Sequence, residues 1–341
     1  MQAFVIDKPG SSSLIETLPK PEAKSGEVLI KIKKVGFCGS DLNTFRGLNP
    51  IVSYPRIPGH EIAAEIVEVG ADVKGDYKAG DKVLVLPYTT CGTCWSCLTN
   101  RPNACKNNKT LGVQQDGGMS EYLSVPAEKL ITDINDMSFS EIAIVEPLAV
   151  GFHAARRAET KAGEYMLVFG CGMVGLGAIA KGARDGATVI AVDIDDEKLE
   201  LSKSFGAKHV INSVKVNLEE EVLRLTEGHG ASVTVEAIGL AQTFVAAVDL
   251  TAFAGRVVYV GYVKDAVSFD TKKFVMKEIQ IRGARNAIKD DFVDVLTAMK
   301  EMNLPIEKLI SKDVPLAEAG EALKFWSENT SEITKILVSF D

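Results

Sequence analysis

The stretch YMLVFGCGMVGLGAIAKGARDGATVIAVD, residues 165–193, decides the fold. An apolar strand runs into a GxGxxG loop, an amphipathic helix follows, and a second apolar strand ends at Asp193. In such a loop Gly170 permits the tight turn, Gly172 lets backbone amides approach a pyrophosphate, and Gly175 lets the helix pack closely on the strand. The helix N-terminus adds unpaired N–H donors for phosphate groups. The pattern predicts dinucleotide binding, although a glycine-rich turn in another α/β fold would satisfy the motif alone.

The acidic residue at the end of the second strand narrows the nucleotide. Asp193 lies where a carboxylate accepts hydrogen bonds from the adenosine ribose hydroxyls. The same charge would repel a 2′-phosphate, and no arginine follows directly, so NAD is favoured over NADP. Lys198 either faces the ribose or is an ordinary solvated lysine. The candidate cofactor-binding residues are Gly170, Gly172, Met173, Val174, Gly175, Asp193 and Lys198.

The pattern of apolar runs, helical segments and turn residues on both sides of this stretch predicts an α/β protein with two domains. After Asp193, the apolar runs HVIN, SVTVEAIG, GRVVYVGY and IQIRGA alternate with helical segments, as in the doubly wound parallel sheet of a Rossmann domain, predicted at residues 150–287. Before it, short runs such as EVLIKIKKVGF and EIAAEIVEVG, cut by turn residues, predict a β-rich domain at 1–149. We expect the tail, 288–341, to return to that first domain and complete it.

Composition limits the classes of partner. The 341 residues carry a formal net charge of −8 with acidic and basic residues interleaved. A nucleic-acid binder or a polybasic membrane anchor would show a concentrated positive patch. The first ten residues fit neither a signal peptide nor a spanning segment. We therefore expect a cytoplasmic protein that acts on small molecules, without nucleic acid or membrane as partner.

Four of the six cysteines crowd into one loop, Cys91-x2-Cys94-x2-Cys97-x7-Cys105. Four thiolates complete the tetrahedral shell of one zinc ion and leave no position for water or substrate, so this zinc would be structural. An iron–sulfur cluster is the alternative, since such clusters are also held by closely spaced cysteines. The absence of a second cluster motif favours zinc over an iron–sulfur cluster. Four crowded cysteines also suit a metal site in a reducing compartment better than a secreted disulfide framework.

Several motifs occur together in one order along the chain: GFCGSD at 36–41, GHE at 59–61, the four-cysteine loop, VEPL at 145–148 and GCGMVG at 170–175. A lone cysteine or histidine is more often structural than a ligand. In combination, and over essentially the whole chain, the motifs resemble the zinc-containing medium-chain dehydrogenase/reductase family. The Glu-Pro-Leu segment and the strings SYPRIPGHE, GVQQDGGMSEYLSVP and RGARNA are similar to its polyol and sugar-acid branch, of the L-galactonate or L-idonate 5-dehydrogenase type.

The resemblance implies a GroES-like catalytic domain, a Rossmann NAD domain and a second, catalytic zinc. Its ligands would be Cys38, His60 and Glu146, with Glu61 able to bind or exchange. One sulfur, one nitrogen and one carboxylate oxygen leave an open position, as a catalytic zinc requires. Asp41 would accept a hydrogen bond from the far ring nitrogen of His60. Alternatively, Asp41 is a turn-forming residue.

The reaction implied by the resemblance is hydride transfer from a secondary alcohol of a polyol or sugar acid to NAD. Ser40 matches the hydroxyl that accepts the alcohol proton in this family, unless it is merely a helix-capping serine. Many relatives place a histidine three residues further on, where this chain has Asn43. Asparagine does not titrate near neutral pH, so the last proton step would run through water or Glu146.

Three residues are candidates for substrate contacts through hydroxyl or carboxylate groups: Arg56, Arg285 and Asn286. Each is alternatively a solvent-facing side chain. Two other functions remain open: amino-alcohol oxidation of the L-threonine 3-dehydrogenase kind, and zinc and NAD binding without catalysis. The apolar strand GRVVYVGY either lies at a sheet edge, where it would pair with a second subunit in a homodimer or homotetramer, or is buried.

Overall fold

The computed structural model describes residues 1–340, which divide into two compact units. The first unit comprises Met1–Glu146 and Ile306–Asp341, and the second comprises Pro147–Pro305. The division differs from the sequence-based boundaries in the segment before residue 306, which had been assigned to the first domain. In the structure that segment is helix α9 (Lys289–Glu301), which contacts α4 (Met173–Arg184) of the second unit.

The first unit is built on a seven-stranded sheet with the order β16-β17-β3-β4-β5-β9, in which β8 also pairs with β3. All its strand pairs are antiparallel except β16 with β17. Its strands are β3 (Glu27–Gly36), β4 (Glu61–Val69), β5 (Lys82–Val85), β8 (Tyr122–Pro126), β9 (Leu130–Ile131), β16 (Lys312–Pro315) and β17 (Ile336–Ser339). Two small sheets accompany it, formed by β1 (Ala3–Lys8) with β2 (Ser11–Ile15) and by β6 (Tyr88–Thr89) with β7 (Lys109–Thr110). Its helices are α1 (Gly39–Phe45), α2 (Trp95–Leu98) and α10 (Ala319–Glu328).

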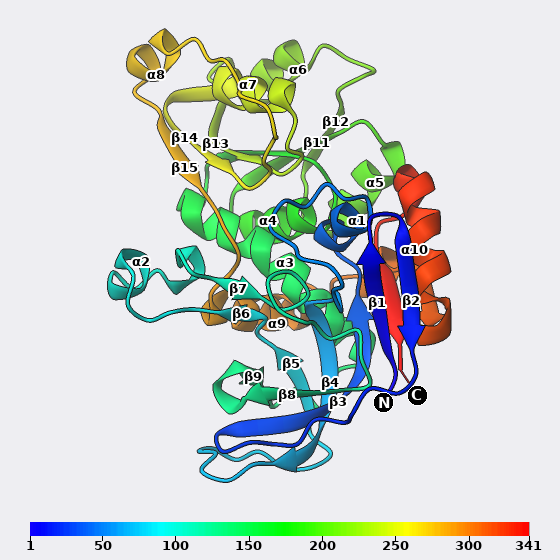
Figure 1. Ribbon diagram of the computed structural model, residues 1–341. Coiled ribbons are helices and arrows are strands. Elements are labelled where there is room, and N and C mark those ends of the chain that lie inside the picture. The colour runs from blue at the N-terminus through cyan, green and yellow to red at the C-terminus, as the bar shows by residue number, and fades with distance from the viewer. Residues whose placement is uncertain (341) are drawn as a thin grey trace. The chain divides into compact units, whose positions relative to one another are not determined.

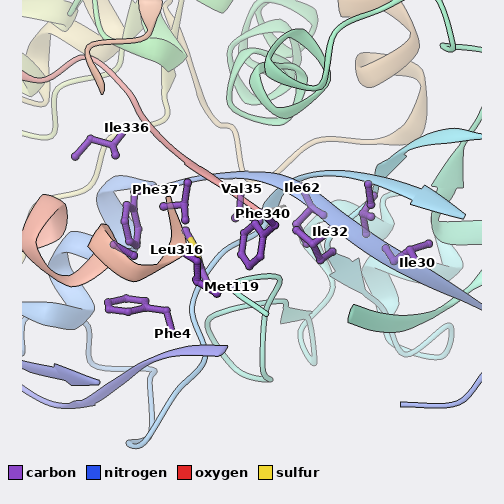
Figure 2. Close-up of a cluster of buried hydrophobic side chains, with 14 of the residues drawn as sticks. Phe4, Ile30, Ile32, Val35, Phe37, Ile62, Met119, Leu316, Ile336 and Phe340 are labelled. Atoms are coloured by element: carbon purple, nitrogen blue, oxygen red, sulfur yellow. The ribbon is translucent and has the colours of Figure 1, made fainter. Parts of the chain in front are cut away.

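Alternation along β3 explains the core of the first unit. Val28, Ile30 and Ile32 on one face are fully buried, whereas Lys31 and Lys33 on the other face are only partly buried, as expected of a strand with one face on the core. Leu29 breaks the alternation, since it lies on the second face and is 2% exposed. Figure 2 shows how side chains from both ends of the chain join this core, with Phe4 from β1 and Phe340 beyond β17 lying near Val35 and Met119. The closing strand therefore belongs to the first unit, as the sequence predicted.

The second unit contains a six-stranded sheet in which every neighbouring pair is parallel. The strand order is β12-β11-β10-β13-β14-β15, so the chain starts in the middle, moves to one edge and then returns to build the other half (Figure 1). This is the doubly wound Rossmann order, as predicted. Its strands are β10 (Tyr165–Phe169), β11 (Thr188–Asp193), β12 (His209–Asn212), β13 (Ala231–Glu236), β14 (Thr251–Tyr259) and β15 (Gln280–Gly283).

Helices connect these parallel strands, as right-handed crossovers require. α3 (Phe139–Ala158) leads into the sheet, and the others are α4, α5 (Asp196–Ser204), α6 (Leu218–Leu225), α7 (Ala241–Leu250), α8 (Lys272–Lys277) and α9. No helix within residues 1–340, the twenty-residue α3 included, is long and apolar enough to cross a membrane.

The strand GRVVYVGY lies inside the sheet and not at its edge. It forms most of β14, which pairs with β13 on one side and β15 on the other, and Val257 and Val258 are fully buried. The edge interpretation of this strand was therefore wrong, and burial accounts for its apolar residues. The two edge strands are β12 and β15, and in β15, which lies in the run IQIRGA of the sequence, Ile281 is 44% exposed.

Candidate metal centres and cofactor loop

Strand pairing brings the first candidate metal ligands together. β3 and β4 are antiparallel with Gly36 opposite Glu61. Cys38 follows the end of β3, and His60 directly precedes β4, so both lie at the same end of the strand pair. One ligand atom each of Cys38, His60 and Glu61 lies within 4.8 Å of the other two. A Cβ at Gly36 would stand 1.9 Å from Glu61 Oε2, so only glycine permits this approach.

The three side chains suit a zinc ion chemically. They offer sulfur, nitrogen and carboxylate oxygen, which are the donors that zinc takes in catalytic sites. Nδ1 of His60 is buried and has no hydrogen-bond partner among residues 1–340, an arrangement that costs free energy unless another group satisfies it. Burial opposes the imidazolium, but the negative charges of Cys38, Asp41 and Glu146 prevail and raise the pKa of His60 well above its usual value. The cluster therefore attracts a cation.

Glu146 lies near this cluster but outside the compact group of three. It is 3% exposed, and its charge acts on both His60 and Glu61. Its Oε1 accepts a hydrogen bond from the Tyr88 hydroxyl at 2.5 Å. Burial and the negative charge of Glu146 raise the pKa of Tyr88 well above its usual value, so the phenol keeps its proton. The structure thus groups Cys38 and His60 with Glu61, whereas Glu146 was the carboxylate ligand in the sequence-based set.

Lys335 is a site residue that the sequence did not reveal. Its ammonium group donates to both carboxylate oxygens of Glu61 at 2.6 Å and to the Phe37 carbonyl at 2.9 Å. Strand β17 brings it there, because Leu337 pairs with Gly36. Burial raises the pKa of Glu61 to about 7, against the opposing effect of the Lys335 charge. The closing strand therefore supplies the counter-ion of a candidate zinc ligand.

Replacing Lys335 with methionine should destabilise the protein. The substitution leaves the Glu61 carboxylate buried without its partner, and breaking a buried pair from one side typically costs about 3–5 kcal/mol. Lys34→Met is the matched control, because Lys34 pairs with the part-exposed Asp313 and such pairs contribute up to about 1 kcal/mol. Urea unfolding measures both. Equal losses of unfolding free energy in the two variants would show that the buried Lys335–Glu61 pair contributes no more than an exposed pair.

The residues on α1 differ in their surroundings. Asp41 is fully buried, and its oxygens accept from the backbone amides of Cys38, at 2.8 Å, and Gly59, at 3.4 Å. The predicted hydrogen bond from His60 to Asp41 is not formed within residues 1–340. Asp41 instead caps α1 and links the backbones of the two loops that carry Cys38 and His60. The Ser40 hydroxyl is buried without a partner in the same described region, and Asn43 is half-buried.

The four-cysteine loop forms a second compact cluster, with all four sulfurs within 4.8 Å of one another. The Cys94 sulfur lies 3.5 Å from that of Cys97 and 3.8 Å from that of Cys105. A tetrahedron with zinc–sulfur bonds of about 2.3 Å has edges of about 3.8 Å, whereas a multi-iron cluster needs wider separations. The Ser96 hydroxyl and nearby backbone amides lower the pKa of Cys94 to about 5, whereas burial and the neighbouring thiols raise the pKa of Cys97 to about 11, so without an ion the four sulfurs do not all ionise. The geometry fits a single structural zinc ion.

The glycine loop of the second unit has the close packing that the sequence predicted. Gly170 has φ +93°, a conformation that favours glycine. A Cβ at Gly175 would stand 1.7 Å from the Gly170 carbonyl oxygen, so helix α4 approaches the loop as only glycine allows. Met173 begins α4, with Val174 next, and Gly172 is its N-cap. The helix N-terminus and its amides thus have the geometry that phosphate binding requires.

Asp193 ends β11 and holds the loop through its carboxylate. Oδ2 accepts from the Cys171 amide at 2.7 Å, and Oδ1 accepts from the amides of Ile194 and Asp195. Asp195 in turn caps α5 by accepting from the amides of Glu197 and Lys198. The Lys198 side chain is half-buried. This end of β11 is therefore strongly negative and unfavourable for a second phosphate.

Adding a methyl group at Gly172 should weaken nucleotide binding without harming the fold. Gly172 has φ −75°, and no atom lies within 4 Å of a Cβ built there, so alanine fits the free protein. If the Gly172 backbone approaches a pyrophosphate, that Cβ intrudes on it, and we expect NADH affinity to fall about tenfold or more, a loss of about 1.4 kcal/mol. Gly283→Ala, at an equally open position of the same unit, is the control. Unchanged NADH affinity in Gly172→Ala by fluorescence titration would contradict the assignment.

The three candidate substrate residues lie in different parts of the chain. The Arg56 guanidinium donates to Asp116 at 2.8 Å and to Ser53 at 2.7 Å, which uses two of its five N–H donors, and its Nε is buried without a partner among residues 1–340. The two internal bonds fix the guanidinium, and its role toward a substrate stays a prediction. Arg285 and Asn286 follow β15 in the second unit, with Arg285 exposed and Asn286 at φ +54°. Both remain predictions.

Two family models match the chain. The alcohol dehydrogenase GroES-like domain matches residues 24–136, and the zinc-binding dehydrogenase domain matches residues 173–301. The first range holds every residue of both candidate metal clusters, whereas Glu146 and Lys335 lie outside it. The second holds most of the Rossmann unit.

Relatives align over nearly the full length. An uncharacterized zinc-type alcohol dehydrogenase-like protein of Haemophilus influenzae is 32% identical and covers 100% of this chain and 99% of its own. The L-galactonate-5-dehydrogenase of Escherichia coli is 34% identical over 94% of each. The rspB protein of E. coli CFT073, described as a short chain alcohol dehydrogenase complexed with NADH, is similar in structure, with TM-score 0.91, 30% identity and 100% and 99% coverage. The chain belongs to the zinc-containing alcohol dehydrogenases of the medium-chain dehydrogenase/reductase family.

Proposed function

We propose that this protein oxidises a secondary alcohol of a polyol or sugar acid with NAD. The observation that carries the proposal is the convergence of Cys38, His60 and Glu61 within 4.8 Å. Three such donors leave a position on zinc for a substrate hydroxyl. When bound, zinc would polarise that hydroxyl and NAD would accept the hydride, so that the alcohol leaves as a ketone and one proton is released.

The residues around the cluster hold the metal and move the proton. Cys38, His60 and Glu61 would bind the ion, and Glu146, which the sequence favoured as a ligand, would act as a further carboxylate beside it. The Ser40 hydroxyl is buried and without a partner within residues 1–340, so it can accept a hydrogen bond from a substrate O–H and release its own proton as it takes the substrate's. Asn43 cannot carry that proton further, which leaves Glu146 or water as its next acceptor.

The cofactor preference follows from Asp193 and its neighbours. The carboxylate is fixed by three backbone amides at the end of β11, close to the acidic N-terminus of α5. A 2′-phosphate placed there would meet like charge, whereas ribose hydroxyls would meet an acceptor. We therefore propose NAD and not NADP.

A substrate panel tests the proposal directly. The purified protein would be incubated with polyols, aldonates such as L-galactonate and L-idonate, and L-threonine, each with NAD or NADP, while NADH or NADPH formation is recorded and zinc per chain is measured. We expect two zinc ions per chain and turnover of a polyol or sugar acid with NAD. If L-threonine is the preferred substrate, the substrate class is amino alcohols and not polyols or sugar acids. One zinc ion and no turnover of any compound would support a binding protein without catalysis.

The proposed assembly is a homodimer or homotetramer. Strand β15 leaves one edge of the six-stranded sheet unpaired within residues 1–340, and Ile281 on it is 44% exposed. Unpaired sheet edges are sites where a second chain can add its own strand. Light scattering coupled to size-exclusion chromatography gives the molar mass, and a monomer at micromolar concentration would contradict this part of the proposal.

A further inference from the structure

Tyr88 is a buried polar residue beside the candidate catalytic cluster, and none of the roles above uses it. It is 8% exposed, and its hydroxyl donates to Glu146 Oε1 at 2.5 Å. Its electrostatic surroundings include Cys38 and Glu61 in addition to Glu146. A buried hydroxyl on a carboxylate is a charge-assisted hydrogen bond, stronger than one between neutral groups.

The backbone of Tyr88 is fixed from two sides. Strand β6, on which it lies, pairs with β7 through Tyr88 and Thr110. The Tyr88 carbonyl accepts a hydrogen bond from the Lys129 ammonium, which joins it to the segment before β9. The four-cysteine loop begins three residues later, at Cys91. The β6–β7 pair closes the loop that carries the four cysteines, so Tyr88 lies at the base of that loop.

The consequence concerns the freedom of Glu146. A glutamate side chain in a helix can adopt several rotamers, and an unrestrained carboxylate loses conformational entropy whenever it must act in one position. With Oε1 accepting from Tyr88, the carboxylate is held in one orientation, and this orientation sets how its oxygens can face the ion, its water or the substrate. We propose that Tyr88 is a positioning residue that holds Glu146 in the orientation the reaction uses.

This inference rests on the proposed function, because the orientation of the Glu146 carboxylate matters only if a reaction takes place beside it. The test compares wild type with Tyr88→Phe, Glu146→Gln and the double variant. Tyr77→Phe is the matched control, since it also removes one phenol hydroxyl from the first unit, where Tyr77 donates to the neutral Ala127 carbonyl at 2.9 Å. Three quantities are measured: kcat and KM for the best substrate, the rate of zinc release to a chelator, and the thermal unfolding midpoint.

We expect Tyr88→Phe to lower kcat about tenfold, the equivalent of one hydrogen bond to a charged group, with a much smaller change in KM. Zinc release from the catalytic site should quicken, and Tyr77→Phe should match wild type in both. In the Glu146→Gln background the Tyr88 change should add little to either quantity, because two residues that act through one contact are not additive.

Failure of this inference can be distinguished from failure of the proposed function. If wild type turns over no alcohol, the proposed function fails; the chelator experiment then still shows whether Tyr88 acts through Glu146. If wild type is active and Tyr88→Phe retains full kcat and a normal zinc-release rate, Tyr88 has no positioning role. Additive effects of Tyr88→Phe and Glu146→Gln on zinc release would overturn it too, and that comparison applies even if turnover is lost.

Discussion

Cys38→Ser is expected to abolish turnover while the protein still binds NADH. The thiolate is the only sulfur in the Cys38, His60 and Glu61 group, and the zinc it helps to hold would supply the polarisation of the substrate hydroxyl. Losing several kcal/mol of transition-state stabilisation lowers kcat about 10³-fold or more. Steady-state kinetics gives the loss, metal analysis should fall from two zinc ions per chain to one, and NADH fluorescence titration should be unchanged.

The unchanged NADH affinity serves as the control in this experiment. The glycine loop and Asp193 lie in the second unit, whereas Cys38 lies in the first, so a local change at the metal ligand should leave nucleotide binding intact. A Cys38→Ser variant that keeps two zinc ions and wild-type kcat would refute the assignment of Cys38 as a ligand.

Cys105→Ala is expected to remove the structural zinc and destabilise the protein. Cys105 is fully buried and its sulfur lies 3.5 Å from that of Cys91. A ligand present at 1,000 times its Kd stabilises the folded state by about 4 kcal/mol, which corresponds to a fall of about 10 °C in the thermal midpoint of a unit of this size. Calorimetry and zinc analysis measure the two effects.

A variant in the same loop separates metal loss from loop disturbance. Leu98 lies on α2 and is 70% exposed, so Leu98→Ala should keep the zinc and the melting temperature of wild type. If Cys105→Ala retains both zinc ions and has the same melting temperature as Leu98→Ala, the four thiolates do not share an ion.

The sequence predicted the architecture well because its strongest signals are local. The glycine loop between two apolar strands led to the doubly wound sheet, and the alternation in EVLIKIKKVGF led to β3. Helix α10 was missed although Ala319, Ala322, Leu323 and Trp326 are buried at helical spacing. The domain boundary near residue 306 could not be inferred, because it depends on α9 packing against α4, a contact between distant segments.

The candidate site was predictable only where residue type and motif coincide. Cys38, His60 and the four-cysteine loop stand in recognisable motifs, and the structure brings each set together. Lys335 carries no such signal, since its partner Glu61 is 274 residues away and the pairing of β17 with β3 alone brings them together. Tyr88 likewise depends on a contact with Glu146 across 58 residues. The choice between Glu61 and Glu146 as the nearer carboxylate also required three-dimensional information.

The proposed reaction requires one ion shared by Cys38, His60 and a carboxylate. An anomalous difference map from crystals of the zinc-loaded protein, collected at the zinc absorption edge, tests it most directly. We expect two peaks per chain, one within the four-cysteine loop and one about 2.0–2.3 Å from Cys38 Sγ, a His60 ring nitrogen and an oxygen of Glu61 or Glu146. A single peak in the cysteine loop, with none between Cys38 and His60, would contradict it.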